Sequence, residues 1–547
     1  MRDVNVEFDL KVKEMFDTFI RRNPILATSL GIHVYDHLLP DGSLRSKLED
    51  IKIMKGFLKD FEELNSPMLT QERKFDRDLA VDSLKLSLLF DEELRFWSRS
   101  PEAPHTLGEA LFLLLSRDFA PLKKRIEFLK GRIESAPKFL KDSMEKLKDP
   151  VEILVRLGVQ TTDGLPNLLN EIIETARKVK FEWMGELTEA ASRASASIKE
   201  YREWLIEDVT PRSRENFAIG KVNVDRILEL RGLGLTSDEL LLFAYSALEM
   251  ERAKLMEIAE KIKPGATIEE VRRIVKANHP KTFDELIQAY RRYIQEAKSF
   301  IAKSGAFTLP ENEDVIVKET PVFMRSLVST AAIFQPAKFD ERQVSVYVIT
   351  PHRDESFLQE HNYHSIPNTT VHETYPGHHM QGCCANMNPS LVRLLTPLPV
   401  EFIEGWAHYC EEYMKDLGFD DTPESRFEQV EDIVWRVTRI ILDIKLARGE
   451  ITFDEAVNYL MEQTGMDRQV ATIEVNEYVE KPTYFLSYYL GKHMILKLKK
   501  DLKERMGGGF DERKFHDILL YSGNLPMKYV RRMVMKNFNV YLGESLL

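Results

Sequence analysis

Apolar residues recur at spacings of three and four along most of this 547-residue chain, and that period restricts it to a mainly α-helical fold. The clearest helix is predicted at 427–446, where one apolar stripe is formed by Phe427, Val430, Val434, Val437, Ile441 and Ile444. Thr422 before it is a typical N-cap, and Pro423 suits the first helical position. Residues 236–239 and 452–455 have the capping-box pattern of two further helix starts.

Strand signals are few. Residues 344–349 are rich in β-branched residues and end before Pro351, and residues 315–317 are a weaker candidate. Helical patterns give way to this region near 303–305, and a shorter helix break is expected at 163–166. We therefore expect a helical lobe at 1–304 and a second lobe at 305–547, which together form one continuous domain over residues 15–545.

Charge and composition exclude several classes of protein. The net charge of −12 argues against nucleic acid as a partner, because phosphate binding favours a basic surface. Three cysteines are too few for a disulfide scaffold. The first residues lack the apolar core of a signal peptide, and no apolar run has membrane-spanning length. We expect a cytoplasmic protein that has no membrane partner.

Seven of the 13 histidines lie between His352 and His408, and three of them share one short window with a glutamate. That window reads His372-Glu373-Thr374-Tyr375-Pro376-Gly377-His378-His379. In a straight helix the second and third of these histidines would rise about 9 Å and about 10.5 Å beyond His372. One zinc ion with bonds of about 2.0–2.1 Å does not span that rise. The sequence therefore predicts a helix break at Pro376-Gly377 that brings a second imidazole back toward His372.

The window predicts a metal site of the zincin kind, in which a glutamate beside a ligating histidine acts as the base. His372 is the first predicted ligand, and spacing alone leaves His378 and His379 both open as the second. We favour His378, because it directly follows the glycine. Glu404 is the predicted third ligand, on a separate helix, with Glu401 as its competitor.

Glu373 is better placed as a general base than as a ligand, because adjacent residues diverge around a helix. His408 and Glu411 are expected on or near the helix face of Glu404. Zinc is the predicted ion, although such ligands also accept manganese or cobalt. Three cysteines near these motifs leave a mixed thiolate site open, but small buried cysteines are more often core residues: Cys383, Cys384 and Cys410.

The block from His372 to Gln381, followed by Glu404-Gly405-Trp406-Ala407-His408-Tyr409, resembles domain-of-unknown-function family 885. That family is grouped with zinc peptidases of the gluzincin clan. Residues 24–31 and 482–491 are similar to its opening and closing blocks. The resemblance implies a large helical zincin-like body with a small β-sheet beside the active site, akin to the carboxypeptidase Taq and thimet oligopeptidase groups. It also implies zinc, and it makes 305–547 the catalytic, metal-binding lobe.

The resemblance implies hydrolysis of peptide bonds, by an exo-acting carboxypeptidase or an oligopeptidase. A zinc hydrolase of a non-peptide amide or ester is an alternative, and a catalytically weak, metal-containing peptide-binding protein is another. The chain departs from the family's pattern at three positions that could orient substrate: Ala447, Glu477 and Tyr484. A homodimer is a further expectation.

The remaining candidates concern the substrate. Tyr488 and Tyr478 are candidate donors to the oxyanion, with Tyr488 preferred for its place in the matching block. A peptide could add to the edge of the strand that contains Tyr347. Arg436 and Arg439 are the candidate cations for a terminal carboxylate.

Overall fold

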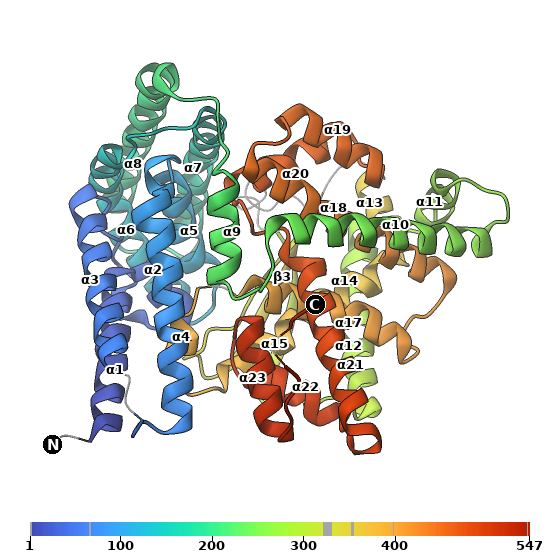
Figure 1. Cartoon of the computed structure of the whole chain (residues 1–547). Coiled ribbons are helices and arrows are strands. Elements are labelled where there is room, and N and C mark those ends of the chain that lie inside the picture. Colours follow the sequence, from blue (N-terminus) through green and yellow to red (C-terminus); the bar gives the residue numbers. More distant parts are fainter. Residues whose placement is uncertain (1–2, 65–66, 321–330, 352–354, 398, 544) are drawn as a thin grey trace. The chain divides into compact units, whose positions relative to one another are not determined.

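A computed structural model gives the fold of residues 3–64, 67–320, 331–351, 355–397, 399–543 and 545–547. The chain is 72% helical with a small three-stranded sheet, so the predicted mainly α fold is confirmed. It divides into two compact units (Figure 1). Unit 1 contains Met1–Phe217 and Ala337–Glu341, whereas unit 2 contains Ala218–Glu319 and most of the chain from Arg342 to Leu547.

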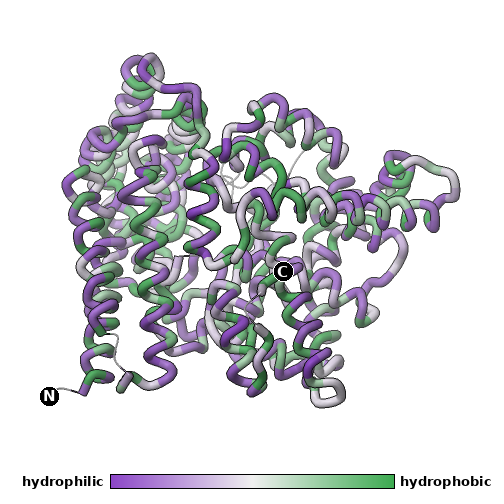
Figure 2. The backbone as a smooth tube through the Cα atoms, viewed as in Figure 1, coloured by the Kyte–Doolittle hydropathy of each residue, from purple (hydrophilic) through white to green (hydrophobic). Residues whose placement is uncertain are grey.

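Unit 1 is built from helices alone among its described residues. Figure 2 shows hydrophilic and hydrophobic residues alternating along their turns, the amphipathic pattern from which helical folding was predicted. Its helices are α1 (Val4–Arg22), α2 (Pro24–Leu30), α3 (Leu44–Glu63), α4 (Gln71–Leu88), α5 (Ala103–Ser116), α6 (Leu122–Ser143), α7 (Glu152–Lys178) and α8 (Met184–Trp204).

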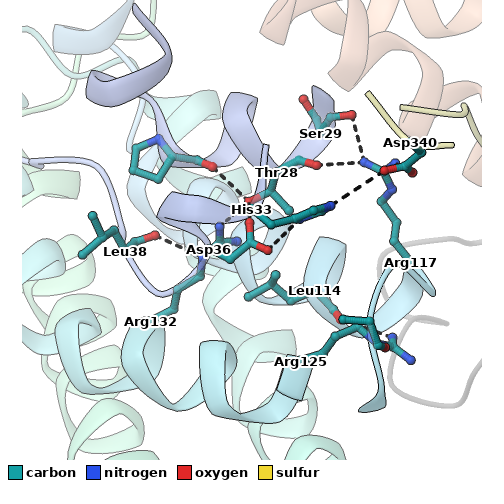
Figure 3. A network of polar contacts seen from close by, with 12 residues as sticks. Thr28, Ser29, His33, Asp36, Leu38, Leu114, Arg117, Arg125, Arg132 and Asp340 are labelled. Atoms are coloured by element: carbon teal, nitrogen blue, oxygen red, sulfur yellow. Dashed lines mark hydrogen bonds and ion pairs between the residues drawn. The ribbon is translucent and has the colours of Figure 1, made fainter. Parts of the chain in front are cut away.

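A polar network lies within unit 1 around the end of α2 (Figure 3). Arg132 is fully buried and donates to the hydroxyl of Thr28 at 2.6 Å, and Thr28 donates to Asp36 at 2.7 Å. His33 Nδ1 lies 2.8 Å from Asp36 Oδ2, and its Nε2 lies 3.7 Å from Asp340 Oδ1. Burial opposes the charged imidazolium, but hydrogen bonds to Asp340 and Asp36 raise the pKa of His33 to about 9.

Arg117 completes this network by pairing with Asp340 at 2.5 Å and donating to the carbonyl groups of Thr28 and Ser29 (Figure 3). Asp340 belongs to the short segment Ala337–Glu341, which packs within unit 1 although strands of unit 2 flank it in the sequence. Asp340 therefore has an arginine partner as well as the imidazole, and Asp36 is held by Thr28 and His33.

Unit 2 contains the sheet and the remaining helices. Most of them are labelled in Figure 1. In chain order they are α9 (Lys221–Leu230), α10 (Ser237–Ile262), α11 (Ile268–Lys276), α12 (Phe283–Ser304), β1 (Glu313–Glu319), β2 (Ala331–Phe334), β3 (Gln343–Ile349), α13 (Glu355–Glu360), α14 (Ser365–Glu373), α15 (His378–Asn386), α16 (Leu391–Leu395), α17 (Val400–Asp416), α18 (Pro423–Arg448), α19 (Phe453–Thr464), α20 (Arg468–Glu480), α21 (Ser487–Met506), α22 (Glu512–Tyr521) and α23 (Met527–Phe538).

The sheet has the order β1-β3-β2, with β1 parallel and β2 antiparallel to β3. Both predicted strands are confirmed, as β1 and β3, whereas β2 is a strand that the sequence did not indicate. The predicted substrate edge at Tyr347 is wrong. Tyr347 lies on β3, and both sides of β3 are already paired, opposite Val317 and Ile333 at this position. The edges of this sheet are β1 and β2.

The predicted helix at 427–446 is confirmed as α18, and the six residues of its apolar stripe are buried. Thr422 caps it, and both predicted capping boxes are present, before α10 and before α19. The break expected at 163–166 is wrong, because α7 continues through Pro166. Buried Leu165 and Leu168 hold that helix together by packing, which outweighs the hydrogen bond that proline removes.

The compact units do not coincide with the predicted lobes at 1–304 and 305–547, because α10 packs along α18 inside unit 2. The expectation that both lobes form one continuous domain over residues 15–545 stays a prediction. Among the described helices, none is both long enough and apolar enough to span a membrane.

Candidate metal centre

The histidine window folds as two short helices joined by a sharp turn. Helix α14 ends at Glu373, and α15 begins at His378. The Gly377 N–H donates to the carbonyl of Val371 at 3.0 Å, so the turn folds back on the last residues of α14. A Cβ at Gly377 would overlap with the carbonyl oxygens of Val371 and His372, which explains the glycine. The predicted break is confirmed.

Helix α17 brings the second motif to this turn. The Trp406 indole N–H donates to the carbonyl of Pro376 at 2.9 Å, which fixes α17 against the break. Gly405 faces Gly491 of α21, where a Cβ on either residue would overlap with the opposite backbone. The Glu-Gly-Trp sequence therefore serves three purposes: a carboxylate at Glu404, close helix crossing at Gly405 and an anchor at Trp406.

The two helix ends and α17 bring His372, His378 and Glu404 together. One ligand atom from each lies within 4.8 Å of the other two. The distance to Glu404 Oε2 is 3.7 Å from His372 Nε2 and 3.4 Å from His378 Nε2. Ligands of a tetrahedral zinc ion at bond lengths near 2.0–2.1 Å are about 3.3 Å apart. The side chains thus fit a zinc ion with little movement.

Glu411 and Asn368 form a second layer behind His372. Glu411 Oε1 lies 2.7 Å from His372 Nδ1, and Asn368 donates to Glu411 Oε2 at 3.0 Å. This contact leaves His372 Nε2 on the side of Glu404, the orientation that ligating histidines generally need. His408 lies 3.3 Å from the same Glu411 carboxylate, and burial lowers the pKa of His408 to about 4.

The cluster is electrostatically coupled. Burial disfavours a charged His372, but hydrogen bonds to Glu404 and Glu411 outweigh it and raise its pKa to about 10. The Glu404 pKa lies well below its ordinary value, because His378 and His372 outweigh the opposing effect of burial. Glu404 is therefore held as a carboxylate, the form that binds a cation.

His379 lies on the other side of the turn. It is fully buried, with Nδ1 2.7 Å from the hydroxyl of Ser345 on β3 and Nε2 2.7 Å from Glu313 on β1. Tyr375 also donates to Glu313, and Lys298 pairs with it at 2.5 Å. His379 thus ties α15 to the sheet, and the group of possible ligands contains His378 instead.

The competing ligands predicted from the sequence lie elsewhere. Glu401 forms a buried ion pair with Arg231. The three cysteines are buried and unbridged, and none belongs to the cluster: Cys383, Cys384 and Cys410. Burial raises the pKa of Cys384 to about 12, which disfavours a thiolate nucleophile or ligand there.

Glu373 is half-buried at the end of α14, next to His372. It lies near the phenols of Tyr347 and Tyr290, whose rings pack edge to face at 5.2 Å. Burial first, and then the charges of Tyr290 and Glu373, raise the pKa of Tyr347 well above its ordinary value. The Tyr347 side chain therefore lies behind the candidate base, deep in the protein.

Two tyrosines near the start of α21 lie near enough to Glu404 to feel its charge. Burial and the negative charge of Glu404 raise the pKa of both Tyr484 and Tyr488 above the ordinary value. Their ring centroids lie 6.4 Å apart, and the Tyr488 ring stacks parallel to Phe485 at 6.3 Å. Tyr488 was predicted from its motif, whereas Tyr484 was noted in the sequence for its departure from the family pattern.

Tyr478 and Arg439 form a separate buried group. The Tyr478 hydroxyl donates to Glu474 at 2.8 Å and accepts from Arg439 at 3.3 Å. Arg439 pairs with Glu474 at 2.9 Å and lies over the ring of Trp435 at 4.0 Å. The Arg439 guanidinium also lies 4.8 Å from the centre of the Tyr488 ring, so this group is in contact with Tyr488.

Arg436 pairs with Asp432 at 2.8 Å and lies over Trp435 at 4.7 Å. Asp432 in turn accepts from Asn368 of the second layer at 3.2 Å. Both candidate arginines thus stand on α18 beside the cluster, and each already has a carboxylate partner.

Two residues with contacts at this site were not predicted. Asn368 precedes His372 by four residues, and that spacing is a signal that could have placed it on the same helix face. Asp443, which binds the turn before α21, has no comparable local signal.

The fold and the site together define a mainly helical protein with a candidate metal site of two histidines and a glutamate. The chain belongs to the family described as "Bacterial protein of unknown function (DUF885)", which matches residues 24–534. The resemblance seen in the sequence is therefore confirmed at the level of the family. No curated protein matches the chain.

Two solved structures share the fold. One, from Shewanella oneidensis, is classed as a lipoprotein of unknown function; it is 21% identical over 96% of this chain and 99% of that chain, with a TM-score of 0.79. The other, classed as a lipoprotein from Colwellia psychrerythraea, is 19% identical over 98% and 100%, with a TM-score of 0.85. An M32 carboxypeptidase from Deinococcus radiodurans R1 is 11% identical over 92% and 96%, with a TM-score of only 0.33.

The expected cytoplasmic location is contradicted by the first two likenesses, since both proteins are classed as lipoproteins. That expectation rested on the composition of the first residues, which does not determine where a member of this fold is found. We withdraw it.

Proposed function

We propose that this protein is a zinc-dependent metallohydrolase that cleaves peptide bonds. The observation that supports the proposal is the placement of His372, His378 and Glu404 with ligand atoms within 4.8 Å of one another. Two imidazoles and a carboxylate are the ligand set of many catalytic zinc sites, which keep a fourth position for water or substrate. Glu411 supports the set by fixing the ring of His372.

The chemistry that a bound zinc ion supplies is polarisation of a substrate carbonyl and a lowered pKa for water. Glu373 would accept the proton of the attacking water, because it is the last residue of α14 and directly follows His372. Its half-buried position leaves it accessible, whereas Glu411 is enclosed and already bound to His372 and Asn368.

Tyr488 would donate a hydrogen bond to the oxyanion, since it faces Glu404 from the start of α21. Tyr478 would contribute through Arg439 and not by direct contact, because its hydroxyl is committed to Glu474. Tyr347 would pack behind Glu373 instead of binding a peptide backbone.

An oligopeptidase is favoured over a carboxypeptidase. The two arginines proposed to bind a terminal carboxylate, Arg436 and Arg439, are paired with Asp432 and Glu474. A substrate carboxylate would have to displace these partners. Cleavage that does not depend on a free carboxyl end needs no such exchange.

Glu373→Gln tests the proposal most sharply. With zinc content held equal, the variant should lose at least about a hundredfold in the rate of peptide hydrolysis, a typical contribution of a general base. Products would be measured by mass spectrometry of a digested peptide library, with short amide and ester substrates in parallel. Equal rates in the two proteins would contradict the role of Glu373. A zinc-loaded native protein that hydrolyses none of these substrates would contradict the proposed activity and favour a binding protein.

A further inference from the structure

The turn between α20 and α21 contains a strained residue. Thr483 has φ +70°, in the left-handed region that β-branched residues rarely adopt. Such backbone conformations persist only where surrounding contacts impose them, and they concentrate at functional sites. Tyr484 and Phe485 follow Thr483 directly, just before α21, and α21 packs along α17, the helix on which Glu404 lies.

Asp443 of α18 holds this turn in place. It is fully buried, and its carboxylate accepts the backbone N–H of Thr483 at 2.6 Å and of Leu486 at 2.9 Å. Arg231 also binds this turn. It donates to the Thr483 carbonyl, and it donates to the Ser487 hydroxyl at 2.7 Å. Buried Asp443 and largely buried Arg231 thus bind the backbone N–H and the backbone carbonyl of one strained residue, Thr483.

Arg231 also connects the turn to α17, the helix that carries Glu404. Arg231 also pairs with Glu401 on α17, one turn before Glu404. A few residues further along α21, Gly491 touches the backbone of α17 at Glu401 and Gly405. The turn, the start of α21 and α17 are therefore fixed against one another within unit 2.

Tyr484 follows the strained residue immediately. Its ring contacts Phe485 at 5.0 Å and Tyr488 at 6.4 Å, so the two phenols stand side by side. Tyr484 is partly exposed, whereas Tyr489, five residues later, is buried and donates to Glu251. A phenol that is partly exposed beside a metal centre can donate its O–H to a substrate oxygen.

We propose that Tyr484 is a second phenolic donor to the substrate, and that Asp443 is the positioning residue that holds it toward the metal centre through the turn at Thr483. This inference rests on the proposed hydrolase function. Loss of the Asp443 contacts would let Thr483 relax to an ordinary backbone conformation. Tyr484 would then turn away from Glu404, while the ligands on α14, α15 and α17 would stay in place.

A double-mutant cycle tests this inference, with Asp443→Asn, Tyr484→Phe and the combined variant, each loaded with zinc. Asparagine keeps the shape of the side chain but presents an NH2 group to one of the two N–H donors. We expect each single variant to lose about tenfold in kcat with little change in KM, below the hundredfold or more seen when a sole oxyanion donor is removed. The combined variant should be no slower than Tyr484→Phe alone, because the two residues act as one unit.

Calorimetric binding of a phosphinic peptide, which mimics the tetrahedral transition state, gives a second readout that needs no turnover. The same cycle should appear there, with each single variant binding about tenfold more weakly and no further loss in the combined variant. Thr483→Gly should restore binding to Asp443→Asn, because glycine adopts the left-handed conformation without the contact. Additive losses, or unchanged binding in Asp443→Asn, would overturn the inference. A native protein that binds the peptide but hydrolyses no substrate would instead contradict the proposed function alone.

Discussion

The polar network of unit 1 and the candidate metal centre of unit 2 both combine histidine with carboxylates, and they differ in what balances the charge. In unit 1, His33 stands between Asp36 and Asp340, and Arg117 pairs directly with Asp340. In unit 2, His372 and His378 stand beside Glu404, and among the described residues no lysine or arginine forms an ion pair with Glu404.

The difference shows why histidine and carboxylate content does not by itself define a metal site. An arginine beside a carboxylate already supplies the positive charge and the hydrogen bonds that a metal ion would supply. The unit 1 cluster is therefore complete as a structural network. The unit 2 cluster has converging ligand atoms and a carboxylate whose charged partners are imidazoles, which are neutral when they bind metal.

The largest effect is expected when a predicted zinc ligand of the unit 2 cluster is removed. His378→Ala should lower zinc affinity by more than the roughly 10–100-fold that loss of an outer hydrogen-bond partner costs, because it removes a direct ligand. Metal content after dialysis measures this, with His33→Ala as the matched control in unit 1. Zinc retained by His378→Ala would contradict the role of His378 as a ligand. Zinc lost from His33→Ala would contradict the purely structural role of the unit 1 network.

A smaller effect is expected from the second layer of the metal centre. Glu411→Gln should accept from Asn368 through its amide oxygen, which turns the amide NH2 toward His372 Nδ1 in place of an acceptor and so orients that ring less firmly. We expect zinc affinity to fall by about tenfold, at the low end of outer-layer effects. Competition with a chelator of known affinity measures it. An affinity equal to that of the native protein would show that Glu411 is only a packing group.

The smallest effect concerns pH and the unit 1 network. The pKa of His33 is raised to about 9, so the stability that it contributes is complete below its ordinary value near 6.5 and is lost as pH rises through 9. We expect the unfolding temperature to fall by only about 2 °C over that range, because His33 is partly exposed and solvent screens its contacts. His33→Gln should show a flatter profile by calorimetry. Parallel profiles for the two proteins would rule out His33 as the titrating group.

Local chemistry made much of the candidate metal centre predictable. Pro376 and Gly377 interrupt a helix by themselves, and the break that they cause is what joins His372 to His378. The apolar stripe of α18 and the capping boxes likewise depend on residues that are three and four positions apart. Each of these features depends on neighbours within one or two turns.

Features set by distant residues escaped prediction. His379 is drawn to the sheet by Glu313 and Ser345, which lie 66 and 34 positions away. The contact of Asp443 with Thr483 spans 40 positions, and β2 pairs with a strand that comes later in the chain. Pro166 stays helical because of packing along α7, which no local rule contains.

X-ray anomalous scattering at the zinc edge, on crystals of the zinc-loaded protein, tests the central claim most directly. We expect one strong peak at about 2.0–2.1 Å from an imidazole nitrogen of His372, an imidazole nitrogen of His378 and a carboxylate oxygen of Glu404. A peak on His33, on His379 or on the cysteines, with none at this cluster, would contradict it.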